Sequence, residues 1–368
     1  MHGPAATGLA QAPAAVPVAD GRRLKLGVLT FHRSINYGSW WQARCLVTGL
    51  RELGHDAVLL DHRSRAIDRA EWRCALQPML PVRSPREDRR RHAEKVRAFA
   101  RSLAHLPRSA PFDADHPALL CGYDAVIVGS DEVWNPSHPW HGGSSLFWGR
   151  GLAGPRLIAH AASCGNHASG LDEGQAGALA RFAAIAVRDR TTASLVEQAT
   201  GRTPPLVLDP VLHFPPAPHP PLRRAPYALV YGHEFPEWLG PAARDWARAR
   251  GLALLSVGYR APFADEHWLE ASPAGFACAV AGASAVITSM FHGCVFALNA
   301  KLPFVAVPSP YRVAKLADLV ALVGAGRHLL DSPAPLAPLL DVPLAPTIEG
   351  AIAALRLRSQ ATLRAALA

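Results

Sequence analysis

The stretch LKLGVLTFHRSINYGSWWQARCLVTGLRELGHDAVLL, residues 24–60, decides the fold. Its first eight residues form a short apolar run, as a buried parallel strand does. After a polar loop, residues 40–53 place apolar side chains at helical spacing, and Gly54 stops the helix. Residues 57–60 form the next apolar run. We therefore predict a strand–helix–strand unit, the building block of a parallel sheet.

The same alternation of apolar runs and helical patterns continues along both halves of the chain. Strands are expected at 123–129, 156–161, 185–188, 206–208, 227–231, 252–257, 285–288 and 304–307. Helices are expected at 191–200, 242–250, 275–281, 295–300, 313–323 and 348–367. Two successive alternations predict an α/β protein with two Rossmann-like lobes and a cleft between them.

The domain organisation follows from changes in composition. Residues 1–23 are expected to be a flexible tail, because the first twenty residues are rich in Ala, Pro and Gly and carry no Lys or Arg for a signal peptide. Prolines make up much of 215–226, which indicates a linker, with a rigid surface loop as the alternative. The expected parts are therefore an N-terminal domain at 24–214 with a helical insertion at about 62–115, the linker, a C-terminal domain at 227–345 and a final helix at 346–368.

Charge and cysteine spacing limit the class of protein. The formal net charge is +9, and residues 83–108 hold nine Lys or Arg against three acids. This run is either a solvated helix face or a basic face for an anionic glycan, a phosphorylated lipid carrier or a membrane surface. No nucleic-acid-binding motif accompanies it.

The six cysteines form no CxxC pair, so we expect neither a zinc site nor a disulfide framework. Free cysteines suit a reducing compartment, so we expect a cytoplasmic location. No apolar run is long enough for a transmembrane helix.

Polar clusters directly follow four of the predicted strands, where ligands of parallel α/β sheets bind. The first, HRSINYGS, places Gly38 where a helix begins, so that backbone N–H groups can approach a ligand. The second, GSDEVWN, carries Asp131, Trp134 and Asn135, which suit a sugar but also suit a helix cap with a packed indole.

The other two clusters carry a cation and an imidazole. AVRDRTTAS places Arg188 at a strand end, where a guanidinium can bind phosphate or carboxylate or simply stabilise a loop with Asp189. TSMFHGCVFAL places His292 in a predicted loop before a helix. A histidine there can bind phosphate or exchange a proton, or it can be structural.

Taken in order, these segments resemble the polysaccharide pyruvyl transferase family. The matching segments are FHRSINYGSWWQ, YDAVIVGSDEVWN, AASCG at 161–165, VRDRTTASL, VLDPV at 207–211, ITSMFHGCVFAL and KLPFVAV at 301–307. The resemblance covers roughly residues 24–325. It implies a GT-B-like fold and transfer of a pyruvyl group from phosphoenolpyruvate to two sugar hydroxyls as a cyclic ketal.

The resemblance also implies roles for individual residues. His292 is expected to exchange a proton and Arg188 to bind the donor. As a hypothesis of our own, Asp131 orients or deprotonates the acceptor hydroxyl. Further donor-binding candidates are Ser163, Ser289, Phe291, Gly293, Arg312 and Lys315. Acceptor-binding candidates are Asn36, Tyr37, Gly38, Gln42, Trp134 and Asn135. No metal and no bound cofactor is expected, since phosphoenolpyruvate is a cosubstrate. The expected partners are a glycan or lipid-linked sugar, with peripheral contact at the inner face of the membrane as an option and without nucleic acid.

Two positions depart from the family pattern. Some members carry Arg two residues before the histidine, where this chain has Met290, so either Arg312 or Lys315 substitutes or the donor differs. Trp40 and Trp41 are bulkier than expected and could reshape the acceptor pocket. The alternatives are therefore a family member that modifies a peptide or another natural product, a GT-B-type glycosyltransferase that uses a nucleotide sugar, and a non-catalytic glycan-binding protein.

Overall fold

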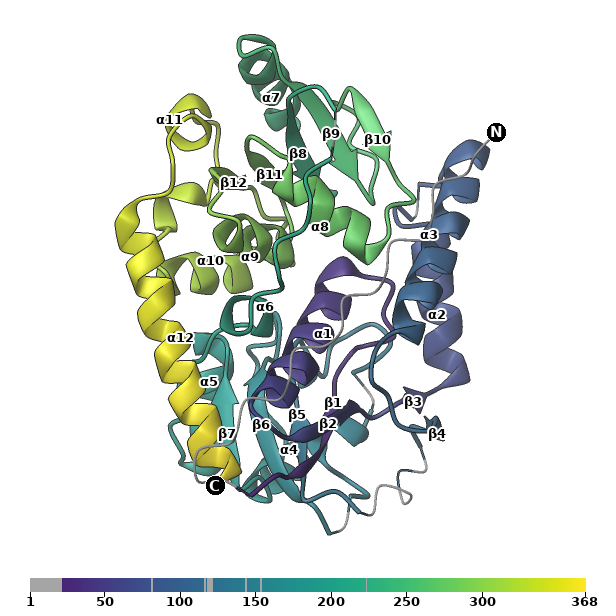
Figure 1. Ribbon diagram of the computed structural model, residues 1–368, viewed down its shortest axis with the longest axis vertical. Coiled ribbons are helices and arrows are strands. Elements are labelled where there is room, and N and C mark those ends of the chain that lie inside the picture. Colours follow the sequence, from purple (N-terminus) through teal and green to yellow (C-terminus); the bar gives the residue numbers. More distant parts are fainter. Residues whose placement is uncertain are drawn as a thin grey trace.

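The computed structural model describes residues 22–80, 82–115, 117, 122–142, 144–152, 154–222 and 224–368. Two five-stranded parallel sheets lie one above the other in Figure 1, each with helices on its faces. This arrangement confirms the predicted fold class, an α/β protein with two Rossmann-like, GT-B-like lobes. The part of the chain that the structure describes contains no helix with the length and apolar character needed to cross a membrane.

The N-terminal sheet has the strand order β2-β1-β5-β6-β7. Its strands are β1 (Lys25–Leu29), β2 (Asp56–Leu59), β5 (Ala125–Val128), β6 (Arg156–Ala162) and β7 (Ala184–Val187). The helices of this half are α1 (Tyr37–Glu52), α4 (Glu173–Ala180), α5 (Arg190–Thr200) and α6 (Pro210–His213). Apolar side chains cover both faces of the central strands, because a parallel sheet is buried on both sides.

The C-terminal sheet has the strand order β10-β9-β8-β11-β12. Its strands are β8 (Tyr227–Tyr231), β9 (Ala253–Val257), β10 (Glu266–Trp268), β11 (Val286–Thr288) and β12 (Phe304–Ala306). The helices are α7 (Leu239–Arg248), α8 (Pro273–Ala281), α9 (Phe291–Asn299), α10 (Val313–Leu322) and α11 (Ala337–Leu340). In this sheet the chain adds β9 and β10 on one side of β8 and then adds β11 and β12 on its other side. The same change of direction occurs between β1 and β5 in the other lobe.

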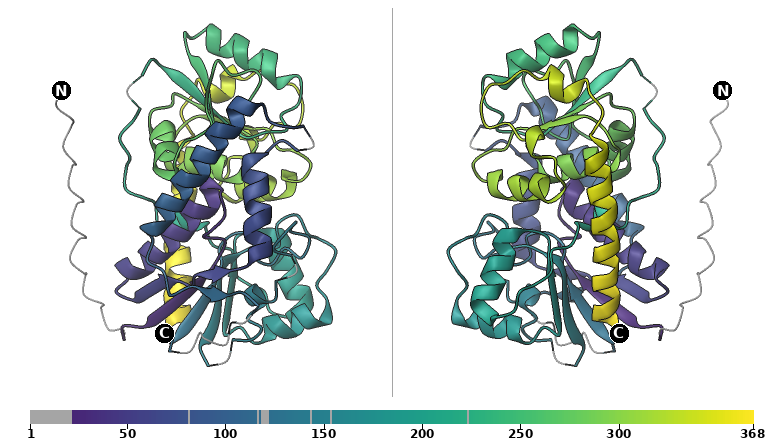
Figure 2. Two further views of the ribbon diagram at one scale, coloured as in Figure 1. Left: turned by 90° about the vertical axis from the view of Figure 1, so that its right-hand side faces the viewer. Right: turned by 90° about the vertical axis from the view of Figure 1, so that its left-hand side faces the viewer.

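An inserted segment joins β2 to β5. It contains β3 (His62–Arg63), α2 (Arg65–Leu76), α3 (Arg86–Ala104) and β4 (Phe112–Asp113). Helices α2 and α3 form an antiparallel hairpin that stands beside both lobes in the left view of Figure 2. Salt bridges attach α3 to the C-terminal lobe: Asp88 pairs with Arg260 at 2.6 Å, and Arg91 pairs with Glu270 at 2.8 Å. The insertion therefore forms a wall across the opening between the lobes.

The last helix, α12 (Pro346–Leu367), returns from the C-terminal lobe to the N-terminal lobe on the side away from α2 and α3 (Figure 1). The Ser359 hydroxyl oxygen accepts a hydrogen bond from the Leu208 N–H at 2.9 Å. Near the end of the chain, Arg156 donates to the Leu367 carbonyl at 2.9 Å. The helix therefore ties the two lobes together at their backs.

The double tryptophan lies in the apolar contact between the lobes, and neither indole is among the residues that line the cleft cavity described below. Trp41 is fully buried, and its indole N–H donates to the Pro273 carbonyl at 3.0 Å. Tyr37 stacks on Phe276 at 4.6 Å and donates its hydroxyl to the Ala271 carbonyl at 2.8 Å. Helix α1 is thus fastened to α8, and large aromatic surfaces at this contact stabilise the lobe arrangement.

Three local predictions need correction. Residues 206–208 form no strand, since only a single bridge pairs Val187 with Leu206. His292 lies in the first turn of α9, which begins four residues earlier than the predicted helix. Short elements such as β10 and α6 were missed, because three or four residues are too few to show a period. The predicted boundary residues of the domains remain predictions.

Candidate active site

A cavity of about 290 Å³ opens between the two lobes. It lies at the carboxyl ends of β1, β5, β8 and β11, the strands between which each sheet reverses its order. Ligand sites of parallel sheets form at this position, because the loops there diverge and leave a crevice. Residues from both sheets and from the inserted hairpin line it, among them Asn36, Ser39, Glu71, Lys95, Asp131, Glu132, Trp140, Arg188, Tyr259, Met290, Phe291, His292, Tyr311, Arg312 and Lys315.

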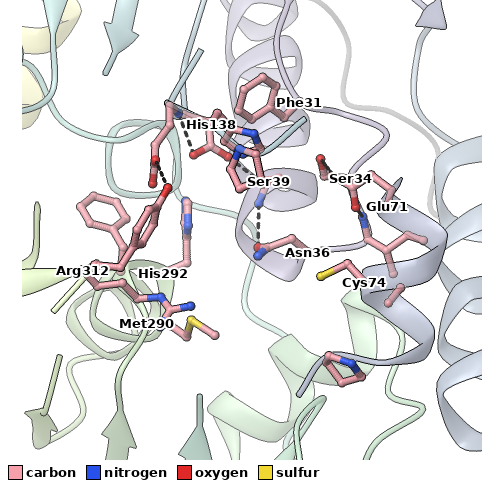
Figure 3. Close-up of a pocket in the computed structure, with 18 of the residues that line it drawn as sticks. Phe31, Ser34, Asn36, Ser39, Glu71, Cys74, His138, Met290, His292 and Arg312 are labelled. Carbon is pink, nitrogen blue, oxygen red and sulfur yellow. Dashed lines mark hydrogen bonds between the residues drawn. The ribbon is translucent and has the colours of Figure 1, made fainter. Parts of the chain in front are cut away.

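Figure 3 shows how the lobes share this cavity. Met290, His292 and Arg312 lie on one side, and Glu71 and Cys74 of α2 lie on the other. Asn36 and Ser39, at the start of α1, lie between the two sides. A ligand in the cavity would therefore contact three separate parts of the chain.

Helix α1 begins against the His292 ring. The Asn36 side chain caps this helix by accepting from the Gly38 N–H at 2.8 Å. A Cβ atom on Gly38 would lie 2.0 Å from Nδ1 of His292, far inside van der Waals contact. Glycine is therefore required at position 38 for a steric reason, and the histidine ring is positioned by a backbone from the opposite lobe.

Asp209 lies behind His292. The Nε2 atom of His292 is buried, is 3.4 Å from Oδ2 of Asp209 and makes no hydrogen bond within the described residues. Burial alone raises the pKa of Asp209, but His292 and Arg188 together lower it below its usual value. An ionised carboxylate thus faces the imidazole. Sequence reasoning quoted the VLDPV segment without assigning a role to this aspartate, and the segment itself was the available signal.

Arg188 connects Asp209 to Asp131. Its guanidinium donates to Asp209 Oδ2 at 3.1 Å and to Asp131 Oδ1 at 3.3 Å. It also lies over the Phe291 ring, 4.5 Å from the centroid. Burial alone lowers the pKa of Arg188, but the two carboxylates raise it. The arginine is charged and held in place by two carboxylates, and it belongs to the lining of the cavity.

Asp131 has an unusual backbone conformation at the end of β5. Its φ of 75° lies in the left-handed region, which aspartate enters more readily than most residues. Its carboxylate accepts from the Ser39 hydroxyl at 2.7 Å. Burial raises the pKa of Asp131, and Arg188 with His292 outweighs that effect and lowers it. A carboxylate that is this readily ionised is a good hydrogen-bond acceptor and a weak base.

A second ion pair crosses the cleft at Glu132 and Lys315. The two groups are in direct contact, and the Tyr311 hydroxyl donates to Glu132 Oε2 at 3.2 Å. Asn135 donates to the same oxygen at 2.9 Å. Burial raises the pKa of Glu132, but Lys315 lowers it more, to about 2. The loop after β5 is thereby joined to α10 of the other lobe, and sequence reasoning did not single out Glu132.

Arg312 occupies the C-terminal side of the cavity beside Met290 (Figure 3). It donates to Nε2 of His233 at 3.0 Å and to Glu234 at 3.1 Å. Burial and the adjacent Arg312 charge lower the pKa of His233 to about 4. His233 is therefore a neutral acceptor at pH 7, and it positions the arginine without cancelling its charge.

The inserted helices supply the outer wall of the cavity. Lys95 of α3 donates to the Gly258 carbonyl at 3.2 Å, with its ammonium 4.8 Å from the ring centroids of Tyr37 and Tyr259. Among the described residues no carboxylate is within 4.0 Å of that ammonium. Burial lowers the pKa of Lys95 to about 8. On α2, Glu71 accepts from the Trp140 indole at 3.0 Å, and its pKa is raised by burial.

Several predicted site residues lie behind the cavity rather than in its lining. Trp134 is fully buried and donates to the Phe147 carbonyl at 2.9 Å, so the indole exposed to the cavity is Trp140. Gln42 donates to the Thr30 hydroxyl at 2.7 Å, and Ser163 accepts from the Gly165 N–H at 2.9 Å. Ser289 donates to the His233 carbonyl at 2.8 Å. These residues, together with Tyr37 and Gly293, support the lining residues.

The structure does bring the principal candidates together. His292, Arg188 and Asp131 lie within one connected network, and Phe291, Arg312, Lys315 and Asn36 line the same cavity. No group of three His, Cys, Asp or Glu side chains within the described ranges is placed to hold a metal ion. The arrangement offers acid–base groups and cations for an anionic ligand in an open cleft between the lobes.

Comparison with known proteins gives one family match. The model of the polysaccharide pyruvyl transferase family matches residues 36–310, which is more than half of the chain. No protein with a curated description matches.

Several solved structures share the general arrangement at low identity. A UDP-GlcNAc 2-epimerase from Neisseria meningitidis, bound to UDP-GlcNAc, is 10% identical with a TM-score of 0.45, and the match covers 93% of each chain. An O-GlcNAc transferase from Thermobaculum terrenum is 12% identical with a TM-score of 0.39, and the match covers 96% of this chain and 66% of that one. The E. coli ADP-heptose heptosyltransferase II is 11% identical with a TM-score of 0.37, and the match covers 92% and 100%.

Proposed function

The chain belongs to the polysaccharide pyruvyl transferase family, and from this premise we propose that it transfers a pyruvyl group from phosphoenolpyruvate to two hydroxyls of a surface or exopolysaccharide glycan. The product is a cyclic ketal, and inorganic phosphate leaves. The observation that carries the proposal is the buried network in which Arg188 connects Asp131 to Asp209 and Asp209 faces His292.

The donor is a small trianion, so its site needs cations. Arg188 and Arg312 are our proposed donor-binding residues, and Lys95 adds an ammonium that no carboxylate neutralises within the described residues. Lys315 and Arg312 both line the cavity and both are paired, Lys315 with Glu132, whose side chain is 9% exposed, and Arg312 with Glu234, whose side chain is 57% exposed. Water weakens the pair with the exposed carboxylate, so Arg312 keeps more of its charge for a ligand. Arg312 is therefore the better substitute for the arginine that Met290 replaces. Such fixed charges stabilise phosphate as it leaves, because a buried site has already excluded the competing water.

Proton transfer is assigned to His292. Ketal formation requires a proton on the donor methylene carbon and the removal of one proton from each attacking hydroxyl. One imidazole can do both in turn: in its protonated form it gives a proton to the donor methylene, and in its neutral form it then accepts the proton of the first attacking hydroxyl. The proton of the second hydroxyl leaves with the phosphate. Asp209 positions the ring through the 3.4 Å contact and stabilises its protonated form.

Asp131 is proposed to orient the acceptor. Its lowered pKa makes it a poor base, and its charge suits it to accept a hydrogen bond from a sugar hydroxyl. Ser39 and Arg188 hold the carboxylate while it does so. Of the two roles considered for Asp131 from the sequence, orientation is therefore the one that its environment supports.

The test is phosphate release from phosphoenolpyruvate by the purified protein, with a panel of hexosides as acceptors. Release that requires both an acceptor and His292 supports the proposal, and mass spectrometry of the product should show a gain of one pyruvate with loss of water. Release without an acceptor would indicate a phosphatase. No release, combined with no thermal stabilisation by phosphoenolpyruvate, would reject this donor. Nucleotide sugars would then be tested in the same assay.

A further inference from the structure

The outer face of the α2–α3 hairpin carries exposed apolar side chains. Seven large hydrophobic residues are exposed among the residues that the structure describes, and three of them lie between positions 72 and 82. These are Trp72 at 60%, Leu80 at 44% and Val82 at 70% exposure. Trp72 lies on α2, and the other two lie in the turn between the helices. Three such side chains in eleven residues form a local apolar tip, whereas single exposed hydrophobic residues are ordinary.

The same face is strongly basic. Of the charged side chains exposed between residues 65 and 104, nine are arginines and two are acids, Glu87 and Glu94. The exposed arginines are Arg65, Arg69, Arg73, Arg83, Arg86, Arg89, Arg90, Arg97 and Arg101. Three further acids lie on these helices. Asp88 pairs with Arg260, Glu71 accepts from Ser34 and Trp140, and Asp68 is half-buried on α2. The outer face therefore presents a large unbalanced positive charge.

This face lies beside the entrance to the cleft. Glu71, Ala75 and Pro78 line the cavity from the same helix and turn that carry Trp72 and Leu80. The hairpin is fixed to the C-terminal lobe through Asp88 and Lys95, so its position relative to the cavity is defined. Figure 2 shows the hairpin on one side of the molecule and α12 on the opposite side.

We propose that the α2–α3 hairpin docks on an anionic lipid surface, with Trp72, Leu80 and Val82 inserted among the headgroups and the arginines above them. Exposed arginines and apolar tips combine in this way at membrane interfaces. There the burial of apolar surface and the attraction of the cations to anionic lipids both contribute to the binding free energy. A hydrated anionic glycan would satisfy the arginines but would not remove Leu80 and Val82 from water. The lipid surface is therefore the better match, and docking would hold the cleft entrance where lipid-linked sugars are found.

The experiment is sedimentation of the full chain with phosphatidylcholine vesicles, with and without phosphatidylglycerol. Binding is expected only with the anionic lipid and should weaken as salt rises. Combining Arg83→Gln, Arg86→Gln and Arg90→Gln should lower the partition coefficient about 100-fold. Leu80→Ser with Val82→Ser should lower it about tenfold at unchanged net charge. All five positions are exposed, so thermal unfolding should remain as in the unmodified protein.

Matched controls come from positions outside the hairpin. Arg244→Gln, Arg358→Gln and Arg364→Gln remove the same charge from exposed positions on α7 and α12, and Val342→Ser with Leu357→Ser removes two exposed aliphatic side chains. Equal losses in these controls would overturn the proposal, as would absence of binding to anionic vesicles. If alginate competes and the Leu80–Val82 variant binds vesicles normally, the face recognises polyanions in general and the lipid proposal fails. None of these readouts depends on pyruvyl transfer.

Discussion

The two walls of the cleft satisfy their charges in different ways. On the inner wall, at the strand ends, Arg188 and Asp209 are buried and paired, and His292 lies against them. On the outer wall, Lys95 has a backbone carbonyl and three aromatic rings as its neighbours, and the outward side of the same hairpin carries many exposed arginines. The comparison indicates that the charged groups of the inner wall are already paired before a ligand binds. Among the described residues, Lys95 and the exposed arginines of the outer wall are not paired with carboxylates and can bind an anionic partner.

The largest expected effect lies on the inner wall. His292→Ala should reduce kcat by about 10²- to 10⁴-fold, because it removes the proposed acid–base group. The alanine side chain is small enough for α9 to form unchanged. His105→Ala, at an exposed position on the insertion, is the matched control and should keep full activity. Steady-state phosphate release measures both. Turnover in His292→Ala within threefold of the unmodified protein would show that His292 is not the acid–base group. The inner wall would then no longer differ from the outer wall in carrying that group.

Glu132 tests the link between the inner wall and α10. The pKa of Glu132 in the folded protein is about 2, below the ordinary value of 4.5 for glutamate, so the unfolded chain binds more protons in acid. The pair with Lys315 therefore stabilises the fold above pH 4.5, and about 3 kcal/mol is lost as the pH falls towards 2. Urea unfolding across that range should show this loss in the free energy of unfolding. In Glu132→Gln the free energy of unfolding should depend less on pH. An unchanged slope in that variant would show that other carboxylates dominate.

Gly38→Ala should disturb the same wall without removing a functional group. The added methyl group would overlap the His292 ring, so the ring must move, and we expect a loss of about 10- to 100-fold in kcat/KM. Gly350→Ala is the control, because nothing lies near the corresponding methyl in α12, and it should stabilise the helix by about 0.5–1 kcal/mol. Equal kinetics for the two variants would mean that the contact does not position the histidine.

The smallest effect concerns the outer wall. If the Lys95 ammonium attracts the donor, the KM for phosphoenolpyruvate should rise about tenfold between pH 7 and pH 9, because the pKa of Lys95 is about 8 and the charge is lost above it. In Lys95→Met the KM should be high at both pH values. A KM that rises equally in the variant would assign the titration to another group. A KM in Lys95→Met equal to that of the unmodified protein at pH 7 would give Lys95 a purely structural role.

The fold was largely predictable, and the reason is local. Strand β8 has the predicted bounds, and α1 and α5 lie where the helical spacing indicates them. A period of two or 3.6 residues and a terminating glycine act within a few residues, so they can be recognised in one sequence. The start of α9 was missed because Phe291 and His292 are also compatible with a loop.

The candidate site was predictable only in part. Polar residues after strand ends indicated Arg188, Asp131 and His292, and all three line the cavity. The sequence could not indicate that Trp134 is buried while Trp140 faces the cavity, since both indoles follow the same strand. Nor could it distinguish Lys95 from the other basic residues of α3, because the packing of that helix against the second lobe selects one of them.

By itself, the sequence determined the order of strands and helices, the two-lobe class and the strand ends at which polar side chains cluster. Only the tertiary structure decided that Asp209 is the carboxylate facing His292 and that Gly38 must be glycine. These contacts join residues from different lobes, and their free energy depends on which side chains are buried together when the sheets pack. That competition for burial involves the whole chain, so no local pattern records it.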